Sequence, residues 1–243
     1  MAQPKLKIGK PKAATAKTIK SWSFTRYNDW NRCPRYAKYK HLDKIPEPKS
    51  PQMLRGAEIA QASEDYLKKK TNRLHPELKA FKEHYQFFRK QPSLVAEENW
   101  GFDLNWNPVP WDDWNNCVLR VKIDIGYQWL EDNSFNIRDG KTGKFNEYKN
   151  EEYKLQLDLY AAAGIARYPQ AKEVTAQLLY TDLGITYPDE EPIIYTAKEA
   201  TAAQKQWDKR VKPMFADRTF APRPGKYCTW CPFSKAKGGP CDF

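Results

Sequence analysis

The spacing of apolar residues along the N-terminal third of the chain follows a helical period. From Ser23 to about Leu42, aromatic side chains recur every three or four residues, and Ser23 is a suitable helix N-cap. After a proline-rich break, the same spacing predicts helices over 54–70 and 76–88, the second with a proline in its first turn. This third is therefore predicted to be helical.

From residue 93 the pattern alternates between apolar and polar positions, which predicts strands with one buried face. A long helix and shorter elements follow these strands. The predicted elements are strands at 94–100, 118–129 and 134–138, a loop or hairpin at 106–114, a helix at 151–167, strands at 174–181 and 193–195, a helix at 197–215 and an irregular tail from Ala221. This order predicts an α/β domain built on a small mixed sheet flanked by helices.

Composition excludes two classes of protein. Hydrophobic residues make up 40% of the 243 residues and aromatic residues 14%, enough for a packed core, so wholesale disorder is excluded. The mean hydropathy is −0.86 and the longest apolar run, 160–166, is far too short to span a bilayer. A membrane partner is therefore not expected.

The net charge of +11 favours a polyanionic partner such as nucleic acid. Six lysines and no acid fall within residues 1–22, and the remaining residues hold 35 basic against 30 acidic side chains, or +5. We therefore predict a basic flexible tail over 1–20, able to follow a phosphate backbone, and one domain over 21–243.

The chain has five cysteines and no secretory signal, which predicts a reducing compartment rather than a disulfide scaffold. Cys117 is interpreted as a small buried residue. The other four lie at the two ends of the chain: Cys33, the C-x2-C pair Cys228 and Cys231, and Cys241.

Two acidic residues and a lysine form the strongest candidate site. Asp124 lies inside an apolar strand, where a charge is costly unless it is paired or bound to a metal. Adjacent antiparallel strands could bring Asp139 beside it, and a divalent cation would accept both carboxylates. Lys141 shares a strand face with Asp139, and a metal beside an ammonium suits phosphodiester hydrolysis. The alternative is an Asp-Gly-Lys turn with a solvated lysine.

The following helix adds two polar side chains to this set. Gln156 and Tyr160 are four residues apart, share a helix face and could reach the same phosphate or base edge. In the 106–114 loop, three tryptophans either stack on unpaired bases or pack in the interior. They are Trp106, Trp111 and Trp114.

Together, Asp124, the Asp139-x-Lys141 pair and the Q-x-x-x-Y helix resemble the RecB-like branch of the PD-(D/E)xK nucleases, which includes CRISPR-associated and phage RecB-type exonucleases. The resemblance also covers the Ser-rich start with its aromatic-flanked Cys33-Pro34, and the C-terminal cysteines. It spans nearly the whole chain from about residue 21.

The resemblance implies a restriction-endonuclease-like core with a hydrolytic site. Asp124, Asp139 and the backbone carbonyl of Gly140 would hold Mg2+ or Mn2+, and Lys141 would be the catalytic lysine. Gln156 and Tyr160 would position DNA. Related nucleases place a further glutamate on the strand before the tryptophan-rich loop, so Glu97 or Glu98 is an additional candidate, with a solvated edge glutamate as the alternative.

The resemblance also implies a structural 4Fe–4S cluster that joins the N- and C-terminal segments. Its ligands would be Cys33, Cys228, Cys231 and Cys241. The nine residues between the last two cysteines are more than family members usually have, so zinc remains an alternative for the four thiolates.

One position departs from the family pattern. The family motif runs Gly-x-x-[Ile/Val]-His, and its histidine is a metal ligand, whereas here Gly56 is followed at the histidine position by Ala60. A methyl group cannot coordinate a metal. We interpret Ala60 as a deliberate, inactivating His-to-Ala change that traps an uncleaved substrate complex, with natural loss of activity as the alternative.

The sequence thus predicts a metal-dependent DNA nuclease, an exonuclease acting on DNA ends or single-stranded segments in the cytoplasm of a bacterial or phage-infected cell. The alternative is a catalytically disabled module that binds DNA ends within a repair or recombination complex. A basic RNA-binding protein with a zinc-ribbon tail would explain the charge and cysteines, but not the Asp, Lys, Gln and Tyr set.

Overall fold

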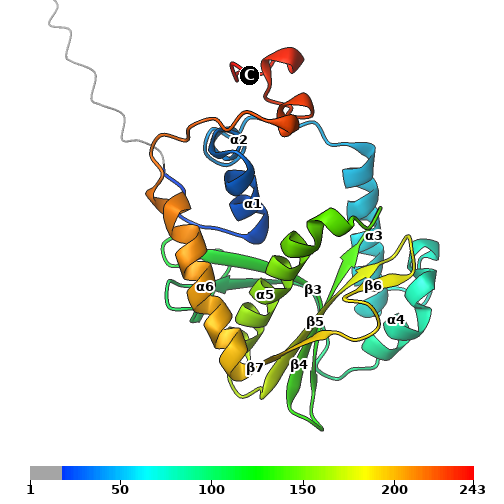
Figure 1. The fold of residues 1–243 in the computed structure, drawn as a ribbon. Helices are drawn as coiled ribbons and strands as arrows, with labels where there is room; N and C mark the ends of the chain where they lie inside the picture. Colours follow the sequence, from blue (N-terminus) through cyan, green and yellow to red (C-terminus); the bar gives the residue numbers. More distant parts are fainter. Residues whose placement is uncertain (1–17) are drawn as a thin grey trace, which may run out of the picture.

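A computed structural model describes residues 18–243 (Figure 1). Most of the predicted basic tail, residues 1–17, lies outside the described residues. Ile19 is already buried in the main hydrophobic cluster, and Trp22 forms a bridge to Leu119.

The centre of the described chain is a seven-stranded mixed sheet with the order β2-β1-β3-β4-β5-β6, in which β7 also pairs with β5. Neighbouring strands are antiparallel except β4 and β5, which are parallel. The strands are β1 (Val95–Phe102), β2 (Pro108–Val109), β3 (Leu119–Trp129), β4 (Ser134–Lys141), β5 (Glu173–Tyr180), β6 (Ile185–Tyr187) and β7 (Ile193–Thr196).

Helices pack on both faces of this sheet. The helices are α1 (Phe24–Arg32), α2 (Pro34–Ala37), η1 (Lys38–Leu42), α3 (Pro51–Leu67), η2 (Pro76–Phe81), α4 (Lys82–Phe88), η3 (Glu147–Lys149), α5 (Asn150–Arg167), α6 (Ala197–Ala216), η4 (Lys226–Thr229) and η5 (Lys235–Lys237). Residues of α5 and α6 join the main hydrophobic cluster, and residues of α3 and α4 form a second cluster on the opposite face. The α/β fold with a central mixed sheet is therefore confirmed.

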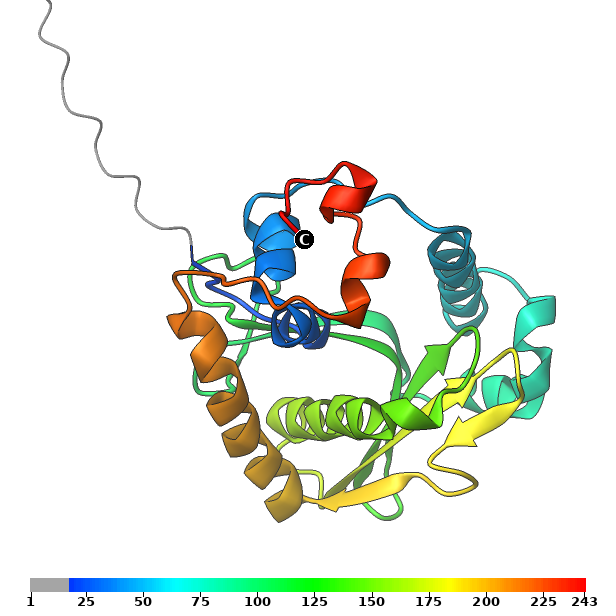
Figure 2. The ribbon, with the colours of Figure 1, turned by 45° about the horizontal axis from the view of Figure 1, so that its top comes forward.

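The C-terminal segment returns to the beginning of the domain. In Figures 1 and 2, the segment after α6 passes beside α1 and α2, and the chain ends next to them. Phe233 packs against Tyr36 and Tyr39, with ring centroids 5.2 and 5.6 Å apart, and the Tyr39 hydroxyl donates to the carbonyl of Pro240 at 3.0 Å. Residues about 200 positions apart in sequence thus share one small core.

Several predicted elements differ from those of the structure. The helix predicted to run from Ser23 to Leu42 is interrupted at Cys33, which is extended because the residue before a proline disfavours the helical conformation. Helix α3 begins at Pro51, earlier than predicted, because Ser50 accepts from the Met53 N–H and caps it. The short strand β6 was not predicted.

The packing of α5 against β5 gives a stability prediction at Gly164. A Cβ atom added there would lie 2.9 Å from Cγ1 of Val174, so Gly164→Ala is expected to destabilise the fold by about 1–3 kcal/mol through overpacking. Urea unfolding measures the change, with Gly225→Ala as control, because a Cβ there meets nothing within 4 Å. A Gly164→Ala protein as stable as the parent would show that the helix and sheet can separate at no cost.

Candidate active site

The antiparallel register of β3 and β4 brings Asp124 and Asp139 to neighbouring positions. The pairing of the two strands ends with Ile125 opposite Arg138, so Asp124 and Asp139 are the residues immediately beyond this last pair. The Gly140 N–H donates to Oδ2 of Asp124 at 3.0 Å, and Nζ of Lys141 lies 2.5 Å from Oδ2 of Asp139. Two carboxylates and one ammonium therefore meet at one place on the sheet.

Helix α5 holds the Asp139 carboxylate from the other side. The Tyr160 hydroxyl donates to Oδ1 of Asp139, and Nε2 of Gln156 donates to the Tyr160 hydroxyl at 2.8 Å and lies 3.4 Å from the same Oδ1. Tyr160 is buried, and its hydroxyl already contacts Asp139. Gln156 and Tyr160 are thus placed to orient the Asp139 carboxylate. Gln156 also lines two cavities.

Glu97 is the third acid of the site. By the β1–β3 register it lies opposite Asp124, and its side chain is 7% exposed and ion-paired with Lys122. Glu98 is 43% exposed, with Oε1 3.8 Å from Arg167. The sequence left open whether Glu97 or Glu98 belongs to the site. Of the two, only Glu97 lines the cavity that contains Asp124.

The alternation of side chains between the two faces of the sheet is interrupted in β1 and β3, where Glu97 and Asp124 lie opposite each other. Val121 and Ile123 of β3 pack in the cluster with α5, whereas Ile125 packs in the cluster with α3 and α4 on the opposite face. Opposite the break, Glu97 has a φ of +50°, a left-handed conformation that is costly for a residue other than glycine. At the acidic site, the side chains of both paired strands therefore change the face of the sheet to which they point.

The electrostatic balance of the site is negative. Burial raises the pKa of Asp124 well above its usual value, and the nearby Asp139 and Glu97 raise it further. Burial lowers the pKa of Lys141, but Asp139 and Asp124 outweigh this effect, so its pKa is raised and the lysine stays protonated. The three carboxylates of Asp124, Asp139 and Glu97 thus outnumber the two ammoniums beside them, those of Lys141 and Lys122.

A divalent cation fits this donor set. Oδ2 of Asp139 is buried and accepts no hydrogen bond, although Lys141 contacts it. The acidic neighbours of Asp124 raise its pKa, so its ionised form is disfavoured. Carboxylate oxygens are the ligands that Mg2+ and Mn2+ prefer. Within residues 18–243, however, no group of three or more His, Cys, Asp or Glu side chains is arranged to hold a metal ion. Asp124, Asp139 and Glu97 therefore do not form such a group by themselves.

Position 60 faces the acidic residues. Ala60 and Gly56 of α3 line a cavity of about 230 Å3 together with Glu97, Asp124 and Lys141. A longer side chain at residue 60 would therefore enter the space beside the two carboxylates.

Two residues near the site were not singled out from the sequence. Tyr85 lines the same cavity and hydrogen-bonds to Ser63 at 3.2 Å; burial, with Asp124 and Glu97 adding to it, raises its pKa to about 12. Tyr153 lines an open groove of about 770 Å3 together with Lys141 and Gln156. The i, i+3, i+7 spacing of Tyr153, Gln156 and Tyr160 is the sequence feature that could have identified it.

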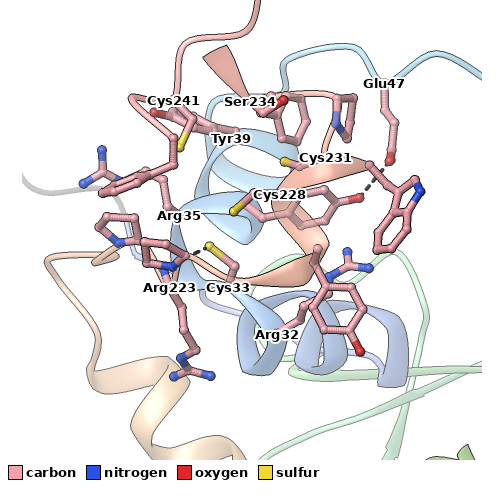
Figure 3. A pocket seen from close by; sticks show the side chains of 18 residues that line it. Arg32, Cys33, Arg35, Tyr39, Glu47, Arg223, Cys228, Cys231, Ser234 and Cys241 are labelled. Atoms are coloured by element: carbon pink, nitrogen blue, oxygen red, sulfur yellow. Dashed lines mark hydrogen bonds between the residues drawn. The ribbon is translucent and has the colours of Figure 1, made fainter. Parts of the chain in front are cut away.

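Four cysteines surround a separate pocket. Figure 3 shows Cys33, at the junction of α1 and α2, and the C-terminal Cys228, Cys231 and Cys241 around one space of about 130 Å3. All are free thiols, and the Arg223 N–H donates to the sulfur of Cys33 at 3.4 Å. Burial raises the pKa of Cys231, and the other three cysteines raise it further. Within residues 18–243, however, no group of three or more His, Cys, Asp or Glu side chains, the four cysteines included, is arranged to hold a metal ion.

The three tryptophans of the 106–114 loop have separate environments. Trp106 is 8% exposed, packs in the main core, and donates from Nε1 to Asp208 at 3.0 Å. Trp114 is 79% exposed and lies against the Arg120 guanidinium, 4.6 Å from its ring centre. Trp111 lines a cavity next to Asp124. Interior packing therefore accounts for Trp106 alone.

Comparisons with known proteins agree with this geometry. A family model described as "PD-(D/E)XK nuclease superfamily" matches residues 21–236. The structure resembles a crystal structure described as a "Putative exonuclease" from Eubacterium rectale, with a TM-score of 0.55 and 14% sequence identity over 88% of this chain and 87% of that chain. A search of curated protein sequences finds no significant match. In residues 18–243, no helix is long and apolar enough to cross a membrane.

Proposed function

Because the chain belongs to the PD-(D/E)XK nuclease superfamily, we propose that it has the architecture of a metal-dependent DNA nuclease that degrades DNA from its ends. The observation that carries the proposal is the meeting of Asp124, Asp139 and Lys141 at one point of the sheet. Gln156 and Tyr160 complete the arrangement from α5. Within this superfamily, we propose that the chain belongs to the RecB-like branch. The order of these residues along the chain and the cysteines in the N- and C-terminal segments support this proposal.

Asp124, Asp139 and the carbonyl of Gly140 are the groups proposed to hold Mg2+ or Mn2+. When bound, such a cation neutralises charge on the scissile phosphate and makes water a stronger nucleophile at neutral pH. Tyr160 and Gln156 keep the Asp139 carboxylate in one orientation by hydrogen bonds to Oδ1, which leaves Oδ2 directed toward Lys141. The protein thus fixes the acidic group before substrate arrives.

Lys141 is proposed to act on the phosphate directly. Its raised pKa keeps the ammonium charged at neutral pH, and the groove that it lines with Gln156 is open to the surface. A fixed ammonium beside the scissile phosphate stabilises negative charge that develops during attack by water, or orients that water. Glu97 is proposed as an additional acidic member of the site.

The experiment that tests the function is a cleavage assay with Mg2+ or Mn2+ on end-labelled linear DNA and on covalently closed circular DNA, each single- and double-stranded. An end-dependent exonuclease releases mononucleotides from linear DNA and leaves circles intact. The assay compares this chain with its Ala60→His variant. Cleavage of circles at the same rate would contradict action from ends.

A second candidate function is favoured by Ala60, whose methyl group faces the acidic cavity where the family has a histidine. Under this alternative, the chain is a disabled module that grips DNA ends within a repair or recombination complex. Binding of linear DNA without cleavage by either the parent chain or the Ala60→His variant would support it over the enzyme.

The four-cysteine pocket is proposed to hold a 4Fe–4S cluster that fastens the C-terminal segment to α1 and α2. Support comes from the shared pocket of Cys33, Cys228, Cys231 and Cys241 and from the small core of Phe233 beside it. The segment after α6 contains only short 3-10 turns, so it has little structure of its own to hold it in place. Cross-linking both ends of the domain restricts the unfolded chain most when the closed loop is long. Zinc is the alternative occupant.

The cysteine pocket gives a metal-content prediction. The protein purified without oxygen is expected to be brown and to contain iron and acid-labile sulfide, and Cys241→Ser is expected to lose both and to unfold at lower temperature. Cys117→Ser serves as control, because Cys117 lies outside the pocket. A colourless protein with one zinc per chain would contradict the cluster.

A further inference from the structure

We propose that a cavity next to the candidate active site binds the terminal nucleotide of a DNA strand, with its base against Trp111 and a phosphate against the first turn of α1. The proposal rests on the proposed nuclease function and specifies how its substrate is held. The cavity measures about 280 Å3. One side is formed by Asp124, Gln156 and Tyr160, and the other by Trp111 and Arg120.

Trp111 is held in place by Arg120. Nε of Arg120 donates to the Trp111 carbonyl at 3.1 Å, and the guanidinium lies 5.7 Å from the centre of the Trp111 ring. Nη1 of the same arginine lies 3.4 Å from the carbonyl of Cys117, at the other end of the loop. A fixed aromatic ring at the edge of a cavity suits a nucleobase, because every base presents a flat face for stacking.

The surroundings of the cavity carry positive charge suited to a phosphate. Phe24 and Thr25, the first two residues of α1, line it, and the N–H groups of a first helical turn have no acceptor within the helix. Arg120 lines it as well, and so does Lys122, whose ammonium is ion-paired with Glu97. Asp124 is the one carboxylate among its lining residues.

Two guanidinium nitrogens near this cavity are buried and have no hydrogen-bond partner. They are Nη2 of Arg120, which lines the cavity, and Nε of Arg26, which does not line it and whose Nη1 donates to Ser21. The two guanidiniums are close enough that Arg120 lowers the pKa of Arg26, second to the effect of burial, and Asp29 compensates only in part. Within residues 18–243, no carboxylate forms an ion pair with either guanidinium. The negative charge of a phosphate in the cavity would offset the repulsion between these two guanidiniums.

The position of the cavity next to the groove would explain why the proposed nuclease requires a DNA end. Gln156 lines both this cavity and the larger open groove of about 770 Å3 that contains Lys141. A strand lying in both would pass Lys141 and Gln156 before it reached Trp111. On this proposal a strand that ends there fits the cavity, whereas a continuous strand would have to pass the loop.

The test measures binding by the full chain with Ala60 and without added divalent metal, so that the DNA is not cut. Fluorescence anisotropy compares a labelled linear single-stranded oligonucleotide with a covalently closed circle of the same sequence. We expect the linear DNA to bind about 10-fold more tightly, the amount expected when one stacked base is gained. Trp111→Ala is expected to remove this preference without changing the affinity for the circle.

Two further variants separate stacking from folding. Trp111→Phe retains an aromatic ring and is expected to keep most of the preference, while Leu104→Ala, an exposed change in the neighbouring turn, is expected to keep all of it. Equal affinity for linear and circular DNA in the parent chain, or a preference that persists in Trp111→Ala, would overturn the terminal-nucleotide pocket. Failure of the parent chain to bind either DNA would instead contradict the proposed function.

Discussion

Replacing Ala60 by histidine is expected to raise metal-dependent DNA cleavage by about 10²- to 10³-fold, the range associated with one preorganised electrostatic group in an active site. The methyl group of Ala60 lines the cavity that contains Asp124 and Glu97, and an imidazole there would add a nitrogen ligand beside the two carboxylates. The measurement is the initial rate of mononucleotide release from end-labelled linear DNA at fixed Mg2+ or Mn2+.

A matched control separates coordination from a general effect of histidine on α3. Ala57→His places an imidazole on the exposed side of the same helix, away from the cavity, and is expected to leave the rate at the parent level. Metal affinity provides a second readout, because Ala60→His should bind Mn2+ more tightly whether or not turnover is fast. An unchanged rate and an unchanged Mn2+ affinity would together exclude position 60 as a ligand position.

Replacing Asp139 by asparagine in the Ala60→His background is expected to remove the restored activity, again by about 10²- to 10³-fold or more. Asparagine has nearly the same shape and can still accept from Tyr160, but it lacks the charge that contacts Lys141 at 2.5 Å and that the cation requires. The rate loss should therefore appear without a collapse of the structure.

Thermal unfolding checks that last point. Asp139 raises the pKa of Asp124, so the two carboxylates oppose each other in the metal-free protein, and removing one charge relieves that repulsion. The substitution also removes the ion-pair partner of the buried Lys141 ammonium, which opposes this gain, so we expect Asp139→Asn to unfold at a temperature close to that of the parent in the absence of metal. Asp189→Asn, a change at an exposed loop residue, is the control for rate and stability. An active Asp139→Asn protein would refute the proposed site.

Local sequence patterns were sufficient for most of the fold. The alternation that predicted β3 and β4 and the helical spacing that predicted α5 depend on residues close together in the chain, and those elements formed within a few residues of their predicted bounds. The same patterns placed Asp124 and Asp139 on adjacent antiparallel strands, because a short connection between two strands leaves few other pairings. Membership of the PD-(D/E)XK nuclease superfamily is confirmed by the match over residues 21–236.

Local sequence patterns did not predict the contacts between segments that are far apart in the chain. The sequence of β3 shows Val121, Ile123 and Ile125 at an unbroken period of two, which predicts one shared face. In the structure, Ile125 packs on the opposite face from Ile123, because the second cluster of α3 and α4 residues takes it up. Burial in two competing cores, rather than strand propensity, decides the facing of this residue.

The sequence by itself determined the α/β class, the acid–lysine–glutamine–tyrosine set and the presence of four cysteines at the two ends of the chain, since each depends on residue type and order. Only the tertiary structure decided that Glu97 rather than Glu98 faces Asp124, that Tyr160 contacts Asp139, and that Ala60 lies in the acidic cavity. The physical reason is that a side chain's charge and hydrogen-bond partners depend on which distant elements pack around it, and this is fixed when the two hydrophobic clusters form on the two faces of the sheet.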